Sequence, residues 1–415
     1  MNAHAALNAE KSTETTLSVV VQSALLSDPS APQNIESLLN WLQKSSDSLS
    51  LSHLRRWLST PSLQGEAARV EASLQIHPDS ALSSCTDKAL AQCLGLNIED
   101  GLMPWAWHHL QTQSFTKAQP MGVTPMGDQL SPIEDSSQGF AMVSLSNWHV
   151  ASGQVIMQPP RAITQAESTQ VLNTLRPYFV GDGIELFEHT PGTWIARSPL
   201  FKDLPSACLE RVMGQDVNPW LIGRTAKPHQ QKAIHTLRRL QSEVQMLLYH
   251  HPINETNASP LNSIWYSATG QAIDDWPKAI ANPWSHETEP LKGSAQDKRL
   301  WLQTKAHTAL WVEDLNNSHL NLDLSSWCEA FEKIDEEIFS QLPQIKGVKS
   351  VEVVFCGLNY SKHWKVVTKG HAPTPTHTTI KKPNAWWNNL PSFTRLWRPS
   401  PPASGVASSL EDLLI

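Results

Sequence analysis

Apolar residues recur at helical spacing over one long stretch in the middle of the chain. Between Gln231 and Tyr249 they lie three or four positions apart. They are Ile234, Leu237, Leu240, Val244, Leu247 and Leu248. Residues with that spacing share one face of an α-helix, so a long amphipathic helix is predicted here. It ends at His250-His251-Pro252, and after a polar loop a short apolar strand is predicted from Leu261 to Tyr266.

Seven shorter segments also show helical spacing or helix boundary signals. They are residues 35–42, 51–58, 86–94, 103–111, 164–177, 206–213 and 326–338. Capping boxes of the S/T-x-x-E type open two of them, at Thr164 and Ser326. Ser206 is expected to cap another and Gly95 to close a fourth. Pro177 is expected to end the helix that Thr164 opens.

Strand-like runs of β-branched and aromatic residues lie between these helices. They are residues 16–22, 140–145, 154–158, 183–188, 193–197, 308–312 and 351–355. The second and third runs are expected to form a hairpin, and the fourth and fifth a strand pair. Because helices and strands interleave, the predicted fold class is α/β or α+β, with a mixed sheet flanked by helices.

Composition along the chain suggests six regions. They are a mostly helical N-terminal region (1–116), a linker or loop (117–138), a central α/β region (139–270), a second loop (271–300), a C-terminal α/β region (301–398) and a disordered tail (399–415). The loops are rich in Pro, Gly, Ser and Asp, which break regular structure.

Charge and cysteine content narrow the function classes. The 415 residues carry a net charge of −7 with scattered Lys and Arg, so no nucleic acid partner is expected. The first residues do not form a signal peptide, and apolar runs are too short to span a membrane, so a cytoplasmic protein is expected. The five cysteines are odd in number and form no CxxC pair, which indicates neither a zinc site nor a disulfide framework.

Seventeen tryptophans are a large number for this length. Tryptophan fills core space, and it also forms docking surfaces. Trp386-Trp387 is the pair least expected to be buried, so a protein-interaction module that uses exposed tryptophans is one alternative function.

Two neighbouring segments carry a family resemblance. Gln245 to Asn254 reads QMLLYHHPIN, and Pro260 to Trp265 reads PLNSIW. Together they resemble a signature of the RpfE-type regulatory proteins of proteobacteria, whose members are often labelled phosphoglycerate mutases. Three outer segments are similar to parts of the same family, namely Asn147 to Val150, Trp327 to Phe339 and Trp397 to Pro399.

The same central segment resembles archaeal-type cofactor-independent phosphoglycerate mutases, which belong to the alkaline phosphatase superfamily. That resemblance implies a degenerate relative of the alkaline-phosphatase-like fold, and for catalysis two divalent metals and a Ser or Thr nucleophile. An Asp ligand is needed at the end of the first strand, but no carboxylate follows Gln22 until Asp28. Walker A, G-x-G-x-x-G, G-x-S-x-G and H-E-x-x-H motifs are also missing. No catalytic residue, metal or other cofactor is therefore expected, except a divalent metal under the mutase alternative.

The central segment supplies the candidate binding residues. They are Asn254, Asn262, Ser263, Trp265, His250, His251 and Arg238. The asparagines and the serine are expected either to staple a tight loop or to form the mouth of a polar pocket walled by Trp265. The histidines are expected to interact with the negative end of the helix dipole, and Arg238 to lie on a solvated face. The predicted function is non-catalytic binding or regulation, with a small anionic ligand or a protein as partner; the alternatives are the metal-dependent mutase and the tryptophan module.

Overall fold

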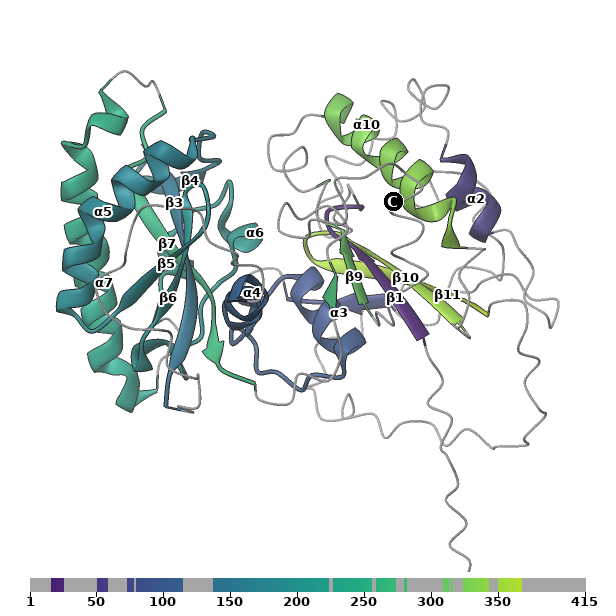
Figure 1. Cartoon of the computed structure of the whole chain (residues 1–415), viewed down its shortest axis with the longest axis horizontal. Coiled ribbons are helices and arrows are strands. Elements are labelled where there is room, and N and C mark those ends of the chain that lie inside the picture. Colours follow the sequence, from purple (N-terminus) through teal and green to yellow (C-terminus); the bar gives the residue numbers. More distant parts are fainter. Residues whose placement is uncertain are drawn as a thin grey trace, which may run out of the picture.

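Two sheets, each with its own helices, make up the protein (Figure 1). The structure is a computed structural model. It describes residues 16–25, 51–58, 73–77, 80–114, 137–223, 227–255, 259–273, 280–281, 309–312, 315, 324–342 and 350–367. The expected features at residues 35–42, residues 117–136 of the linker, the Trp386-Trp387 pair, Trp397 to Pro399 and the tail lie outside these ranges.

The first sheet combines strands from both ends of the chain. Its order is β2 (Ser73–Gln75), β11 (Tyr360–Val367), β10 (Ser350–Cys356), β1 (Thr16–Val21), β9 (Ala309–Val312) and β8 (Ile280–Ala281). From β10 to β8 the neighbouring strands are parallel, whereas β11 is antiparallel to both β10 and β2. The N-terminal and C-terminal regions of the sequence therefore share one sheet, with β1 near its middle.

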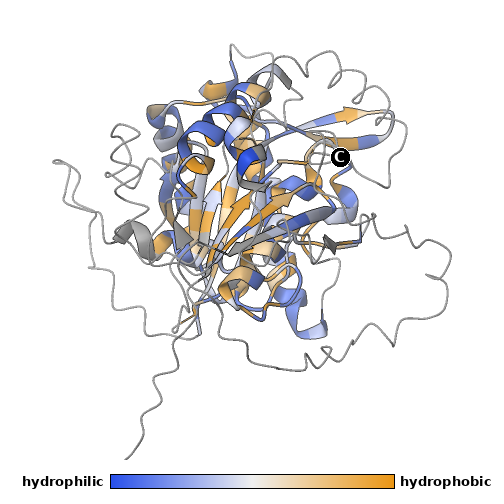
Figure 2. Cartoon of the chain, turned by 90° about the vertical axis from the view of Figure 1, so that its right-hand side faces the viewer, coloured by the Kyte–Doolittle hydropathy of each residue, from blue (hydrophilic) through white to orange (hydrophobic). Residues whose placement is uncertain are grey.

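Strand β1 is apolar on both faces because helices cover both sides of the sheet. Val19 and Val21 pack into one core with α2 (Ser52–Leu58) and α10 (Leu324–Ile334), while Val20 packs on the opposite side against α3 (Cys85–Leu94). Parallel strands buried on both faces typically read as continuous apolar runs. Figure 2 shows these apolar strands inside the layer of more polar helices.

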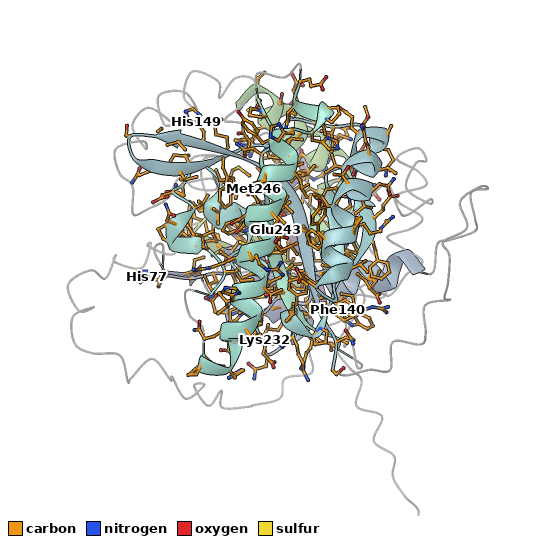
Figure 3. The ribbon with its side chains drawn as sticks, turned by 90° about the vertical axis from the view of Figure 1, so that its left-hand side faces the viewer. His77, Phe140, His149, Lys232, Glu243 and Met246 are labelled. Atoms are coloured by element: carbon orange, nitrogen blue, oxygen red, sulfur yellow. The ribbon has the colours of Figure 1, made fainter. Side chains whose placement is uncertain are left out.

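The second sheet is antiparallel and centred on β3 (Gly139–Ala151). β3 pairs with β4 (Gln154–Gln158), with β6 (Thr193–Arg197) and with β7 (Ser263–Gln271), and β6 pairs in turn with β5 (Glu185–Thr190). The apolar stripe of α7 (Gln231–Tyr249) and that of α5 (Gln165–Gly181) form one core with this sheet. The outward face of α7 carries Lys232, Glu243 and the exposed Met246 (Figure 3).

Helices α4 (Trp105–Ser114) and α6 (Leu209–Val212) lie between the two sheets (Figure 1). Trp107 and Leu110 of α4 pack on Phe140 and Ile195, which project from the face of the second sheet opposite α5 and α7. Short helical turns complete the fold: η2 (Pro199–Phe201), η3 (Asn218–Trp220), η4 (Pro228–Gln230), η5 (Pro252–Asn254) and a π-helical turn, η7 (Asp335–Phe339), that continues α10.

The α/β class and the mixed sheet flanked by helices are confirmed, but several predicted boundaries are wrong. Strands β3 and β7 continue well beyond the predicted residues 140–145 and 261–266. Helix α5 continues through Pro177 to Gly181, and burial of Phe179 favours this continuation. Pro177 has no N–H, so the carbonyl four residues earlier loses its helical hydrogen bond. Because Pro177 lies on the exposed side of the helix, water can bind that carbonyl. Cys208 rather than Ser206 precedes α6, and the Ser206 hydroxyl instead bonds Thr269. Ser326 lies inside α10, which has already begun at Leu324.

Candidate functional site

Asn254 holds together the loop that joins α7 to β7. Its side-chain Nδ2 donates to the carbonyls of Leu248 and Leu261, both at 2.9 Å, and its Oδ1 accepts from the Leu261 N–H at 2.9 Å. One amide thus binds a carbonyl in the last turn of the helix and both polar main-chain groups of Leu261, two residues before β7 begins. The geometry matches a loop staple, as Asn commonly provides in turns.

Asn262 performs a similar task between β7 and β3. Its Oδ1 accepts from the main-chain N–H of Trp148, and its Nδ2 donates to the Trp148 carbonyl, each at 2.8 Å. The β7–β3 ladder has its last pair at Ser263 and Ser146. The side chain of Asn262 therefore continues the ladder beyond the point where the main chain of β7 leaves it.

The other predicted residues also have protein partners. The Ser263 hydroxyl accepts from Gln245 Nε2 at 3.1 Å, and Trp265 Nε1 donates to the Ala207 carbonyl at 2.9 Å. His251 is buried, its Nδ1 accepts from the Ile253 N–H, and burial lowers its pKa. His250 is exposed beside Tyr249, and Arg238 Nε donates to the Ile222 carbonyl at 3.1 Å. Ligand binding by these residues stays a prediction.

A cavity of about 160 Å³ lies elsewhere, between the two sheets. Its lining comes from the end of β1, from β9, from the first turn of α3, from α4, from the start of α6 and from β7. The polar and aromatic lining residues considered below are Gln22, Thr86, Asp87, Trp105, Glu210 and Trp311. None of the seven candidate binding residues from the sequence is part of this lining.

At the cavity, the Asp87 carboxylate binds one indole N–H directly, and the Glu210 carboxylate is linked to a second indole N–H through Gln22. Trp105 Nε1 donates to Asp87 Oδ1 at 2.6 Å. Glu210 acts through Gln22, whose Nε2 donates to Glu210 Oε1 and whose Oε1 accepts from Trp311 Nε1 at 3.0 Å. The Gln22–Glu210 contact joins the first sheet to α6, which lies in the chain between strands β6 and β7 of the second sheet, 188 positions after Gln22.

The first turn of α3 borders the cavity. Ser84 and Asp87 form a capping box, so the N–H groups at these two positions are satisfied by side chains. Thr86 is only 2% exposed, and a hydrogen bond from its hydroxyl partly opposes the rise that burial causes in the pKa of the Cys356 thiol.

Burial shifts the titration of several groups around the cavity. It raises the pKa of the Asp87 carboxyl, although hydrogen bonds from Ser84 and Trp105 oppose that shift. It raises the pKa of the Cys208 thiol well above its ordinary value and lowers that of His109. A thiol that stays protonated is a poor nucleophile. In the part of the chain that the structure describes, no three His, Cys, Asp or Glu side chains are placed to hold a metal ion.

Only part of this site could be found in the sequence. The S-x-x-D pattern of Ser84 and Asp87 resembles a capping box at the start of a predicted helix, and this was a signal for the first turn of α3. Nothing local marks Gln22, Glu210 or Trp311, because packing between distant segments brings them together.

Comparisons with known proteins add two weak structural likenesses. No protein-family model and no curated protein matches the chain. The PH0037 protein from Pyrococcus horikoshii superposes with a TM-score of 0.42 at 12% identity, over 85% of this chain and 88% of that one. A cofactor-independent phosphoglycerate mutase from Thermoplasma acidophilum gives 0.32 at 12% identity, over 86% and 91%. At these values neither structure assigns the chain to a family. Among the described helices none is long and apolar enough to cross a membrane.

Proposed function

We propose that the chain is a non-catalytic protein that binds a small molecule in the cavity between its two sheets. The observation that carries this proposal is the origin of the lining: β1, β9 and α3 belong to the first sheet and its cover, whereas α6 and β7 belong to the other half. A ligand held there contacts both halves at once. Its binding energy therefore stabilises one arrangement of the halves, which is how a regulatory protein responds to a ligand.

The chemistry of the lining supports binding better than turnover. The thiol of Cys208 is kept protonated by burial, and no metal-holding group occurs among the described residues. Membership of the RpfE-type family, a regulatory role and a cytoplasmic location are part of the same proposal. The first two rest on the QMLLYHHPIN and PLNSIW segments, and the third on the shortness of the apolar runs.

A screen of small fragments tests the proposal. Ligand-observed NMR with neutral, anionic and cationic fragments should detect binders of the wild-type protein that the Met142→Trp variant no longer binds. Met142 lines the cavity and is only partly buried, so a larger side chain at this position fills the space. Met246→Trp is the matched control, because Met246 is 64% exposed on α7. If every bound fragment binds Met142→Trp equally well, the cavity is not the binding site.

A metal-dependent phosphotransfer enzyme is the second candidate. The buried Thr86 hydroxyl at the start of α3 favours it, because such enzymes need a Ser or Thr nucleophile. The described residues do not supply the metal ligands that would ionise this hydroxyl. Elemental analysis of the purified protein separates the two functions: about two tightly held Mn or Zn ions per chain would support the enzyme and contradict the binding protein.

A further inference from the structure

We infer that the cavity binds a small uncharged aromatic ring that carries a hydroxyl group, as phenol does. This inference rests on the proposed function and names its ligand class. It departs from the small anionic ligand that the sequence suggested. Three features support it: a buried hydroxyl that lines the cavity, a wall of aromatic rings, and the size of the space.

Ser267 of β7 presents its hydroxyl to the cavity. The residue is 7% exposed and lines the space, and its hydroxyl has no hydrogen-bond partner among the described residues. Ser83, Ser84 and Ser206 line the same cavity, but their hydroxyls already bond other protein groups. A buried hydroxyl that lacks a partner costs free energy. A ligand group that donates to the Ser267 hydroxyl, or accepts from it, offsets that cost.

A bulge in β7 brings two consecutive residues to the cavity. Between Phe140 and Met142, β3 advances by two residues, while their partners on β7, Gly270 and Ser267, are three residues apart. Ala268 lies within this bulge with a φ of 51°, a left-handed conformation that is costly for alanine. In a regular strand Ser267 and Ala268 would point to opposite faces, yet both line the cavity. The strained backbone therefore coincides with the Ser267 hydroxyl, as it commonly does at ligand sites.

Aromatic rings and a thioether form part of the remaining wall. The ring centroids of Trp105 and Trp311 are 6.2 Å apart and tilted by 47°, and the His109 ring lies 6.2 Å from Trp311 at a tilt of 42°. Met142, which pairs with Ser267 in the sheet, also lines the cavity. Aromatic rings attract one another at tilted angles, and sulfur contacts with a ring are favourable. An aromatic ligand therefore gains contacts here that an aliphatic one lacks.

The space suits one ring without a charge. An apolar cavity of about 150 Å³ binds benzene, and this cavity measures about 160 Å³. A buried charge is costly unless it is paired and hydrogen-bonded, whereas Ser267 offers a single neutral hydroxyl. The Asp87 carboxyl already accepts from the Ser84 N–H and from Trp105 Nε1. A phenol has a pKa of about 10, so it is uncharged at neutral pH and brings one O–H group for Ser267.

Four small ring compounds test the ligand class. Phenol, cyclohexanol, benzylammonium and benzoate are titrated separately into the full chain at pH 7 by ligand-observed NMR. We expect phenol to bind roughly tenfold or more tightly than either ion, because the ions lose hydration on burial. Cyclohexanol carries the same hydroxyl on an aliphatic ring and should also bind more weakly than phenol. Absence of phenol binding, or equal or tighter binding by any of the other three, would overturn the inference.

Ser267→Ala locates the hydrogen bond. It should weaken phenol binding by roughly twofold to tenfold and leave the binding of toluene, which has no hydroxyl, unchanged. Ser144→Ala is the matched control, because Ser144 is a buried serine of β3 that does not line the cavity, and it should leave phenol affinity unchanged. The same phenol affinity in the wild type and in Ser267→Ala, or equal losses for phenol and toluene, would contradict the hydrogen bond. Melting temperatures show whether the variants are folded, and Ser267→Cys, with its weakly hydrogen-bonding thiol, replaces an unfolded Ser267→Ala.

The failures of the two proposals differ. If Met142→Trp abolishes the binding of other fragments but phenol does not bind the wild type, the phenol inference is wrong and the binding function stands. If Met142→Trp abolishes the binding of no fragment, phenol included, the binding function fails as well.

Discussion

The side-chain amide of Asn262 binds both main-chain polar groups of Trp148, accepting from its N–H and donating to its carbonyl at 2.8 Å each. Asn262→Ala should therefore lower the free energy of unfolding by about 1–3 kcal/mol, because two partly buried main-chain groups lose their partner. Urea denaturation followed by tryptophan fluorescence measures the change. Asn173→Ala on the exposed face of α5 is the control, and equal midpoints for the two variants would contradict the ladder role of Asn262.

Gly139 lies where no side chain fits. A Cβ at this position would stand 2.1 Å from the Lys202 amide nitrogen and 2.6 Å from the Phe201 carbonyl carbon, and main-chain atoms cannot rotate away. Gly139→Ala should cost about 3 kcal/mol of stability. Gly181→Ala is the matched control: nothing lies within 4 Å of its added Cβ, and alanine is the better helix former, so it should be neutral or stabilising by up to about 1 kcal/mol. Thermal melting of both variants distinguishes these outcomes.

Phe331 joins α10 to the first sheet. Its ring meets Trp327 at 5.1 Å and Phe355 at 5.8 Å between centroids, both edge-on, and it is fully buried. Phe331→Ala should destabilise the protein by about 3–5 kcal/mol through lost apolar burial and the cavity left behind. Tyr249→Ala removes an aromatic ring that is 78% exposed and should change stability little. Similar denaturation midpoints for the two variants would show that the α10 contact contributes nothing.

His108 should make the protein less stable in acid. Burial lowers its pKa from 6.5 to about 4 in the folded protein. Between those two pH values the unfolded chain binds more protons than the folded one, so this contribution to stability falls as the pH is lowered from about 6.5 toward 4. His108→Gln should flatten the dependence of the unfolding free energy on pH in that window. The same substitution at the exposed His250 gives the control, and identical slopes for the wild type and His108→Gln would exclude the effect.

Local pattern predicted most elements of this fold. The predicted helix from Gln231 to Tyr249 has the observed bounds, and the capping box of Thr164 and Glu167 forms as expected. Gly95 closes α3 in the left-handed conformation that glycine permits. The errors arose where tertiary contacts override local preference, as at Pro177 and Ser206. Strand β11 was not predicted; it forms by pairing with β10.

By itself the sequence determined which segments are helices and strands and which of their faces are apolar. Those properties depend on residues a few positions apart, whose periodicity and capping are read locally. Only the tertiary structure decided that β1 lies between β9 and β10, and that Gln22 meets Glu210 and Asp87 meets Trp105. Such pairings are selected by the burial of whole apolar faces and by the hydrogen bonds of buried polar groups. Neither can be inferred from how far apart the partners lie in the sequence.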